Sequence, residues 1–136
     1  MGIKDQLALK IGLRMEYSEK VMEHFMCPQN CGRISNPDVS FAYGDPSCGD
    51  AVIFFMRVKD NIIEDISYLV YGCCAAVASA SMGSVLAKGK SLEEALTITD
   101  EQIEQALDGL PESKKHCSNL GASAIKGMIG KYLAIN

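Results

Sequence analysis

The sequence predicts an α+β fold in which a three-stranded antiparallel sheet packs against several α-helices, with an open metal site at one end. Apolar residues alternate through much of 39–71, as in strands, and recur every three or four positions on either side, as in helices. Three cysteines with polar neighbours fall at the expected junctions between these elements. A chain of 136 residues can bury one core, so we expect a single domain over 1–136.

The N-terminal part is predicted to form two helices. Ile3, Leu7 and Ile11 are spaced by four residues, so residues 1–15 form an N-terminal extension that is either a short helix over 3–13 or a frayed end. This extension is a candidate contribution to a homodimer. Helical spacing resumes at Tyr17 and continues until proline stops it at position 28. Turn-forming residues then predict a loop over 28–38.

Three short strands follow the loop. They are expected at 39–43, at 50–58 and from the turn at Asp60-Asn61 to about Tyr71. Because they are sequential and linked by turns, they predict an antiparallel meander. One face of the second strand is apolar and carries Val52, Phe54, Met56 and Val58.

The opposite face of that strand carries Ile53 and Phe55. We expect a helix to cover these two side chains. The alternative is that they form a surface for a partner.

The rest of the chain is predicted to be helical. Residues 74–88 are rich in Ala and Ser, whose small side chains allow close packing on the sheet, and Gly89 ends this helix. Capping-box pairs at 91/94 and 99/102 begin two short helices, and Pro111 precedes the last one. The last helix has one apolar face, which consists of Leu120, Ala124, Ile125, Met128, Ile129, Tyr132 and Leu133.

Composition argues against several classes of protein. The net charge is −4 and the lysines are scattered, which disfavours nucleic-acid binding. No apolar run approaches the roughly 20 residues that span a bilayer, and charged residues interrupt the apolar N-terminus, so we expect neither a membrane segment nor a signal peptide. The expected location is the cytoplasm, where six cysteines are thiols or metal ligands rather than disulfides.

Three separated cysteines have the local settings of ligands. Cys48 precedes the second strand, and Asp50, two residues later, can point to the same side. Cys73 begins a helix, where free N–H groups favour the thiolate. His116 and Cys117 stand at the start of the last helix. Such donors suit zinc or an iron–sulfur cluster, and the alternative is three unrelated buried thiols.

Several longer runs resemble the U-type iron–sulfur cluster assembly scaffolds, the IscU/NifU family. In chain order they are YSEKVMEHF, PSCGDA, YGCCAAVASASM, VLAKGKSLEEAL and DGLPESKKHCSNLG. The resemblance covers roughly residues 16–134 and is closest to the N-terminal scaffold domain of NifU-type proteins. The interval from 73 to 117 leaves no room for the insertion of the zinc-dependent SufU branch.

The resemblance implies a role for each site residue. Cys48, Cys73 and Cys117 match the cysteines that hold a nascent [2Fe–2S] cluster, with Asp50 and His116 as further metal ligands. Which of these two is the fourth ligand is left open. Cys117 matches the acceptor of persulfide sulfur from a cysteine desulfurase.

The resemblance also implies partners. Lys114 matches a lysine that pairs with the aspartate. Acceptor apo-proteins and a source of iron and electrons are the other expected partners. The segment from Leu110 to Lys114 departs from the family's chaperone-docking motif, so recognition by a heat-shock-type chaperone is not carried over.

The remaining cysteines and histidine have simpler interpretations. Cys74 replaces a family glycine, and we expect a small buried side chain rather than a spare sulfur-trapping thiol. Cys27 and Cys31 are expected to be unligated thiols, with an accessory metal or redox pair as the alternative. His24 is expected to lie at the surface or partly buried rather than to bind metal.

The leading hypothesis is a non-enzymatic scaffold that accepts sulfur, gathers iron, assembles a labile [2Fe–2S] cluster and transfers it. Zinc is expected to occupy the cluster-free form. The alternatives are a zinc hydrolase, in which Asp50 or His116 acts as a base, and a structural zinc domain.

Overall fold

A three-stranded antiparallel sheet forms one layer of the fold, and two long helices pack against it. The computed structural model describes residues 17–45 and 49–135, so the expected helix over 3–13 and Cys48 lie outside the described residues. The strands are β1 (Val39–Asp45), β2 (Asp50–Lys59) and β3 (Ile62–Tyr71), and they pair in the order β1-β2-β3. This is the meander that the sequence predicted.

The register of the sheet follows the alternation in the sequence. Phe54 of β2 pairs with Phe41 of β1 and with Tyr68 of β3. The turn between β2 and β3 has positive φ at both Asp60 and Asn61, 53° and 64°. Both central residues of a type I′ hairpin turn have positive φ, and this turn type suits the right-handed twist of the strands.

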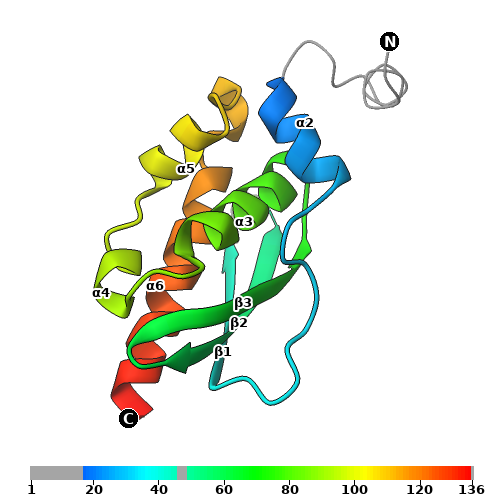
Figure 1. The fold of residues 1–136 in the computed structure, drawn as a ribbon. Helices are drawn as coiled ribbons and strands as arrows, with labels where there is room; N and C mark the ends of the chain where they lie inside the picture. The colour runs from blue at the N-terminus through cyan, green and yellow to red at the C-terminus, as the bar shows by residue number, and fades with distance from the viewer. Residues whose placement is uncertain (1–16, 46–48, 136) are drawn as a thin grey trace.

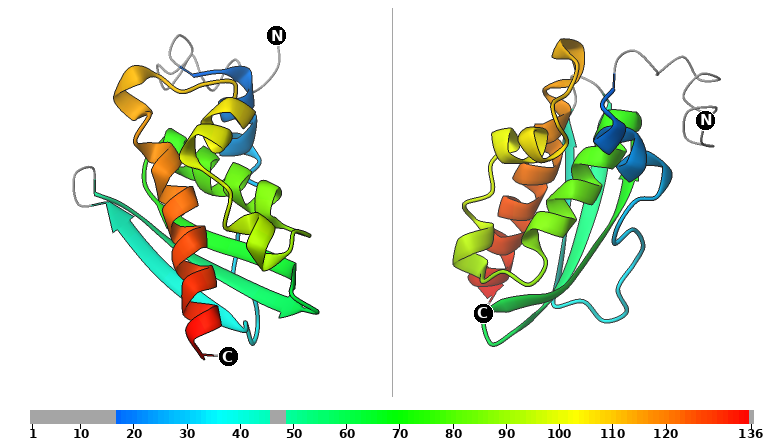
Figure 2. Two further views of the ribbon diagram at one scale, coloured as in Figure 1. Left: turned by 90° about the vertical axis from the view of Figure 1, so that its left-hand side faces the viewer. Right: turned by 45° about the horizontal axis from the view of Figure 1, so that its top comes forward.

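The helices lie on one face of the sheet (Figures 1 and 2). They are α2 (Glu19–Met26), α3 (Cys74–Ala87), α4 (Leu92–Ala95), α5 (Asp100–Ala106) and α6 (Cys117–Ile135), with a 3₁₀ turn, η1 (Glu112–Lys114), before α6. Both predicted capping boxes are present, at Ser91 with Glu94 and at Thr99 with Gln102. They satisfy backbone N–H groups that the first turn of a helix leaves unpaired.

The core lies between the sheet and the two long helices. Val52, Phe54 and Met56 are at most 3% exposed, which confirms the predicted inner face of β2. The apolar face of α6 is also confirmed from Leu120 to Ile129, whereas Leu133 is 52% exposed at the protruding end of the helix. The predicted apolar face of α6 therefore extends past the part of the helix that packs on the sheet.

The expectation that a helix covers Phe55 and Ile53 is wrong. Phe55 is buried, but the guanidinium of Arg33 lies over its ring, 5.9 Å from the centroid, and Arg33 belongs to the connector before β1. The same connector runs beside the edge of β3, where the N–H of Gly32 donates to the carbonyl of Tyr68 at 2.8 Å. Phe55 is therefore covered by a polar loop, which contacts the sheet through Arg33 and Gly32, rather than by a helix.

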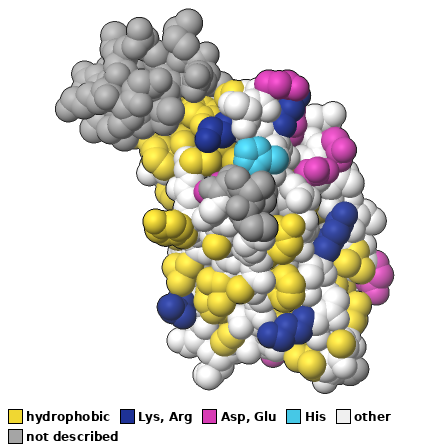
Figure 3. Space-filling view, turned by 180° about the vertical axis from the view of Figure 1, so that it is seen from behind, with side chains coloured by type: hydrophobic (Ala, Val, Ile, Leu, Met, Phe, Trp, Pro, Cys, Tyr) yellow, Lys and Arg dark blue, Asp and Glu magenta, His cyan; other side chains and the backbone are white. Residues whose placement is uncertain are grey.

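The other half of this face is open and apolar. Residues of all three strands, among them Ile53, Leu69 and Tyr71, line a shallow hollow of about 300 Å³. Figure 3 shows hydrophobic side chains gathered on this side of the molecule, away from the helices. In the described part of the chain, no helix has both the length and the apolar character required to cross a membrane.

Candidate metal and sulfur site

Three potential ligands from distant parts of the sequence meet at one end of the sheet. Asp50 is the first residue of β2, Cys73 is the N-cap of α3 and Cys117 is the first residue of α6. One ligand atom from each of the three residues lies within 4.8 Å of the others. The fold thus brings together three of the predicted site residues, and it does so at the junctions where the sequence placed them.

The spacing of these atoms fits metal coordination. The Sγ atoms of Cys73 and Cys117 are 3.8 Å apart, and each lies 3.8 Å from Oδ2 of Asp50. Two thiolates bound to one tetrahedral ion at about 2.3 Å would also be about 3.8 Å apart. The two cysteines could therefore occupy two corners of a tetrahedron without rearrangement of their helices, and the carboxylate lies beside a third corner.

The surroundings of Cys73 favour the thiolate form of its side chain. Its pKa is lowered to about 6, first by the hydrogen bond with Cys117 and further by the backbone N–H of Ala76 and the charge of Lys114. Burial and the negative charge of Asp50 act in the opposite direction. The sequence predicted a thiolate from the helix N-terminus alone, whereas the neighbouring thiol has the largest effect. Thiolate is the form that binds metals and attacks sulfur.

The adjacent cysteine behaves in the opposite way. Cys74 is 7% exposed, and burial raises the pKa of its thiol to about 12. It is therefore protonated at neutral pH, which agrees with the prediction of a small buried side chain.

His116 borders the site from the solvent side. Its Nε2 atom lies 3.6 Å from Sγ of Cys117, and its side chain is exposed. Lys114 forms no ion pair with Asp50 in the described residues, so its contribution here is the charge felt by Cys73. Sequence reasoning missed Lys115, which pairs with Glu104 of α5 at 3.2 Å and with Glu112 at 3.7 Å. The pair with Glu104 joins the segment that carries His116 to α5, and the pair with Glu112 lies within that segment.

Cys27 and Cys31 lie apart from this cluster. Both are exposed free thiols, and in the described residues the only group with metal-binding spacing is that of Asp50, Cys73 and Cys117. His24 is partly buried, as expected, and its Nδ1 atom is 2.7 Å from Oγ of Ser81 on α3. Burial and the charge of Lys20 lower its pKa.

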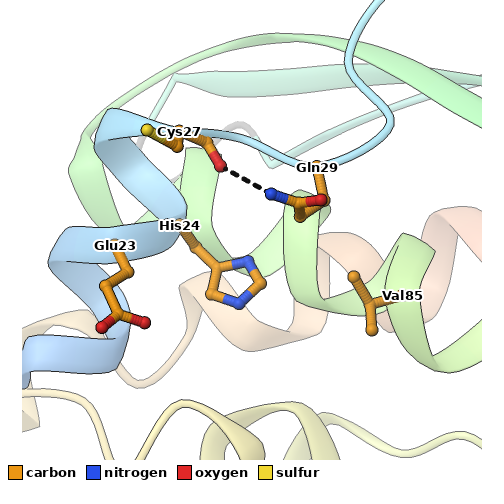
Figure 4. A pocket seen from close by; sticks show the side chains of 5 residues that line it. All are labelled: Glu23, His24, Cys27, Gln29 and Val85. Carbon is orange, nitrogen blue, oxygen red and sulfur yellow. Dashed lines mark hydrogen bonds between the residues drawn. The ribbon is translucent and has the colours of Figure 1, made fainter.

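His24 also lines a hollow between α2 and α3. The hollow has a volume of about 430 Å³ and is bordered by Glu23, Cys27, Gln29 and Val85 as well. Figure 4 shows that the side chains of Glu23 and Cys27 point away from the imidazole, while the amide of Gln29 donates to the carbonyl of Cys27. These residues do not converge on a common point, so the hollow has no arrangement of metal ligands.

Comparisons with known proteins identify the family to which this chain belongs. A family model described as the NifU-like N-terminal domain matches residues 16–136. An iron–sulfur cluster assembly scaffold protein IscU 1 from Archaeoglobus fulgidus is 48% identical over 120 residues, which cover 88% of this chain and 78% of that protein. The IscU scaffold protein of Escherichia coli K12 is 43% identical over 122 residues, which cover 87% of this chain and 94% of that protein.

Solved structures show the same fold at lower sequence identity. A NifU-like N-terminal protein from Brucella abortus superimposes with a TM-score of 0.75 at 15% identity, covering 88% of this chain and 95% of that one. A scaffold protein for the SUF system from Fervidobacterium islandicum gives 0.69 at 21% identity, covering 83% and 96%. The sheet and its layer of helices are therefore shared among these proteins.

Proposed function

Since this chain belongs to the family of NifU-like N-terminal domains, whose IscU relatives are iron–sulfur cluster assembly scaffolds, we propose that it builds a [2Fe–2S] cluster on its three cysteines and passes it on. The observation that carries the proposal is the convergence of Asp50, Cys73 and Cys117 at one end of the sheet. Cys48, two residues before Asp50, is the third cysteine ligand of the proposal.

The proposed ligands suit an iron–sulfur cluster that has to be released to an acceptor protein. Thiolates are soft ligands for iron and sulfide, and a carboxylate is a harder substitute. Three thiolates with Asp50 or His116 should therefore hold the cluster less firmly than four cysteines do in a ferredoxin. Such lability is a disadvantage for an electron carrier but a requirement for a scaffold.

Sulfur enters as a persulfide on Cys117. The thiolate of Cys117 attacks the outer sulfur of a persulfide on a cysteine desulfurase, a new S–S bond forms on Cys117, and the desulfurase cysteine leaves as a thiolate. Nε2 of His116, 3.6 Å from Sγ of Cys117, is placed to take the proton of the thiol. Because Cys117 is 2% exposed, docking of the desulfurase has to uncover its sulfur.

Electrons for the cluster come from two sources. Two sulfane sulfur atoms need four electrons to become two sulfides. Oxidation of two Fe²⁺ ions to Fe³⁺ supplies two of these electrons, and an external electron donor supplies the other two. Iron, an electron donor and acceptor apo-proteins are therefore partners of the proposed reaction. Thiols persist in reducing compartments, so the proposed use of cysteine ligands is compatible with the expected location in the cytoplasm.

Zinc is compatible with the same ligands. Cys₃ with a carboxylate or imidazole is a donor set that Zn²⁺ accepts. We therefore expect zinc in the cluster-free chain, where it competes with iron. A hydrolase would need further groups to bind a substrate near the metal.

Cluster transfer tests the proposal. The chain would be loaded anaerobically with Fe²⁺, cysteine and a cysteine desulfurase, separated from them, and mixed with apo-ferredoxin in the presence of an iron chelator. We expect the ferredoxin spectrum to develop at the expense of the scaffold spectrum, with little iron lost to the chelator. A cluster that stays on the chain, or no cluster at all, would contradict the proposal.

A further inference from the structure

The two helices that carry the thiols touch just behind the site. Ser79 of α3 is fully buried and faces Gly121 of α6. A β-carbon built on Gly121 would lie 2.9 Å from the backbone oxygen of Ser79 and 3.2 Å from its Oγ. A carbon cannot approach a backbone atom this closely without a shift of one helix, since well-packed interiors leave no slack. The missing side chain at 121 therefore fixes how closely α3 and α6 approach.

A hydrogen bond at the same crossing fixes how the helices are aligned along their length. Oγ of Ser79 donates to the backbone carbonyl of Ser118 at 3.3 Å, and both residues are buried. Ser118 directly follows Cys117. The bond thus connects α3 to the first turn of α6, the turn that begins with a site cysteine.

The contact between Ser79 and Gly121 is close enough to the two thiols to affect the distance between their sulfur atoms. Ser79 is six residues from Cys73, and Gly121 is four residues from Cys117, which correspond to about 9 Å and about 6 Å along a helix. Over such lengths a helix behaves as a stiff rod. A displacement at the crossing is therefore transmitted to the first turn of each helix, where the two sulfur atoms lie 3.8 Å apart.

We propose that Ser79 and Gly121 are positioning residues that set the separation of the Cys73 and Cys117 sulfur atoms, and thereby the affinity of the site for a thiolate-bound metal. This inference deepens the proposed function and rests on it for its biological consequence. The geometry itself can be tested without a cluster, a desulfurase or an acceptor protein.

Cobalt titration of the reduced full-length chain under anaerobic conditions tests the inference. Co²⁺ bound by thiolates gives charge-transfer absorption in the near ultraviolet, so the same titration yields the affinity and the absorbance per bound ion. We expect Gly121→Ala to weaken Co²⁺ binding at least tenfold, as changes outside the ligand shell do, and to reduce the absorbance per ion. A role limited to stability would lower the melting temperature and leave both cobalt readouts of the folded chain unchanged.

Gly83→Ala is the matched control. It makes the same substitution on the neighbouring turn of α3, but its β-carbon would meet Cδ1 of Ile125, at 3.2 Å, which is the movable end of a side chain. We expect its cobalt affinity to stay within twofold of the unmodified chain. The inference is overturned if Gly121→Ala binds cobalt as the unmodified chain does, if Gly83→Ala loses as much affinity, or if the unmodified chain shows no sulfur-to-cobalt absorption.

Ser79→Ala decides the matter if Gly121→Ala does not fold. It removes the hydroxyl donor to Ser118 without adding volume. A loss of cobalt affinity of threefold or more supports the inference, and an unchanged affinity overturns it. A chain that binds cobalt as expected but assembles no cluster would contradict the proposed function and leave this inference standing.

Discussion

Gly72 and Asp50 lie so close together that position 72 has no room for a side chain. A β-carbon at Gly72 would be 2.7 Å from Oδ1 of Asp50 and 2.9 Å from the β-carbon of Ala76. The carboxylate therefore rests against bare backbone one residue before Cys73. This contact explains why a glycine precedes the cysteine: it lets β2 place a carboxylate beside the start of α3.

Gly72→Ala should therefore displace the Asp50 carboxylate from the two sulfur atoms. We expect the affinity for Zn²⁺ to fall about tenfold, since the ligand set loses its preformed geometry. Competition with a chromophoric chelator measures this affinity. Gly44→Ala is a suitable control because its β-carbon would meet the backbone oxygen of Asp50 at an ordinary 3.6 Å. Equal affinities of the two variants would show that the contact has no effect on the site.

The pKa of Cys73 predicts a pH dependence for its alkylation. Because the pKa is lowered to about 6, most of the thiol is already thiolate at pH 7. The rate of reaction with iodoacetamide should rise up to about pH 6–7 and then level off, whereas a free thiol with a pKa of about 8.5 continues to gain rate above pH 8. Peptide mass spectrometry of the metal-free chain would follow each cysteine. A rate for Cys73 that still rises through pH 9 would contradict the assignment.

Cys74 should contribute to stability and not to assembly. Its thiol is buried and its pKa is raised to about 12, so we expect it to act neither as a ligand nor as a nucleophile at neutral pH. We expect Cys74→Ala to lower the free energy of unfolding by about 1 kcal/mol through lost packing. Denaturant titration gives this value. Cluster yield should stay within twofold of the unmodified chain, and a complete loss of cluster would instead identify Cys74 as a ligand.

Much of this architecture follows from local sequence patterns. Alternation at Val52, Phe54 and Met56 gives the inner face of β2, and the capping box of Ser91 with Glu94 gives the start of α4, because both depend on residues a few positions apart. The positions of Cys73 and Cys117 at helix starts could also be read locally.

Contacts between distant segments could not be predicted in this way. Arg33 covers Phe55 across 22 positions, and Gly121 meets Ser79 across 42. Neither pair has a periodic signal, because each depends on how complete elements pack in three dimensions. The large effect of Cys117 on the pKa of Cys73 belongs to the same class, since it needs the two helix starts to meet.

Replacing the carboxylate of Asp50 by a thiolate should make the chain retain its cluster instead of transferring it. In Asp50→Cys the proposed ligand set becomes all sulfur, which binds iron–sulfur clusters more firmly. We expect cluster formation to continue and transfer to apo-ferredoxin to slow by about tenfold or more. Stopped-flow or manual mixing with circular dichroism detection gives the transfer rate. Transfer as fast as from the unmodified chain would mean that the carboxylate is not the source of lability.

The proposal that Cys73 and Cys117 hold the cluster is tested most directly by the visible circular dichroism of the chain after anaerobic incubation with Fe²⁺, cysteine and a cysteine desulfurase. Cys73→Ser and Cys117→Ser would be compared with Cys27→Ser, which changes an exposed thiol outside the site. We expect a cluster signal in Cys27→Ser equal to that of the unmodified chain and a loss of about tenfold or more in the two site variants. Equal signals in all three variants would contradict the claim that Cys73 and Cys117 hold the cluster.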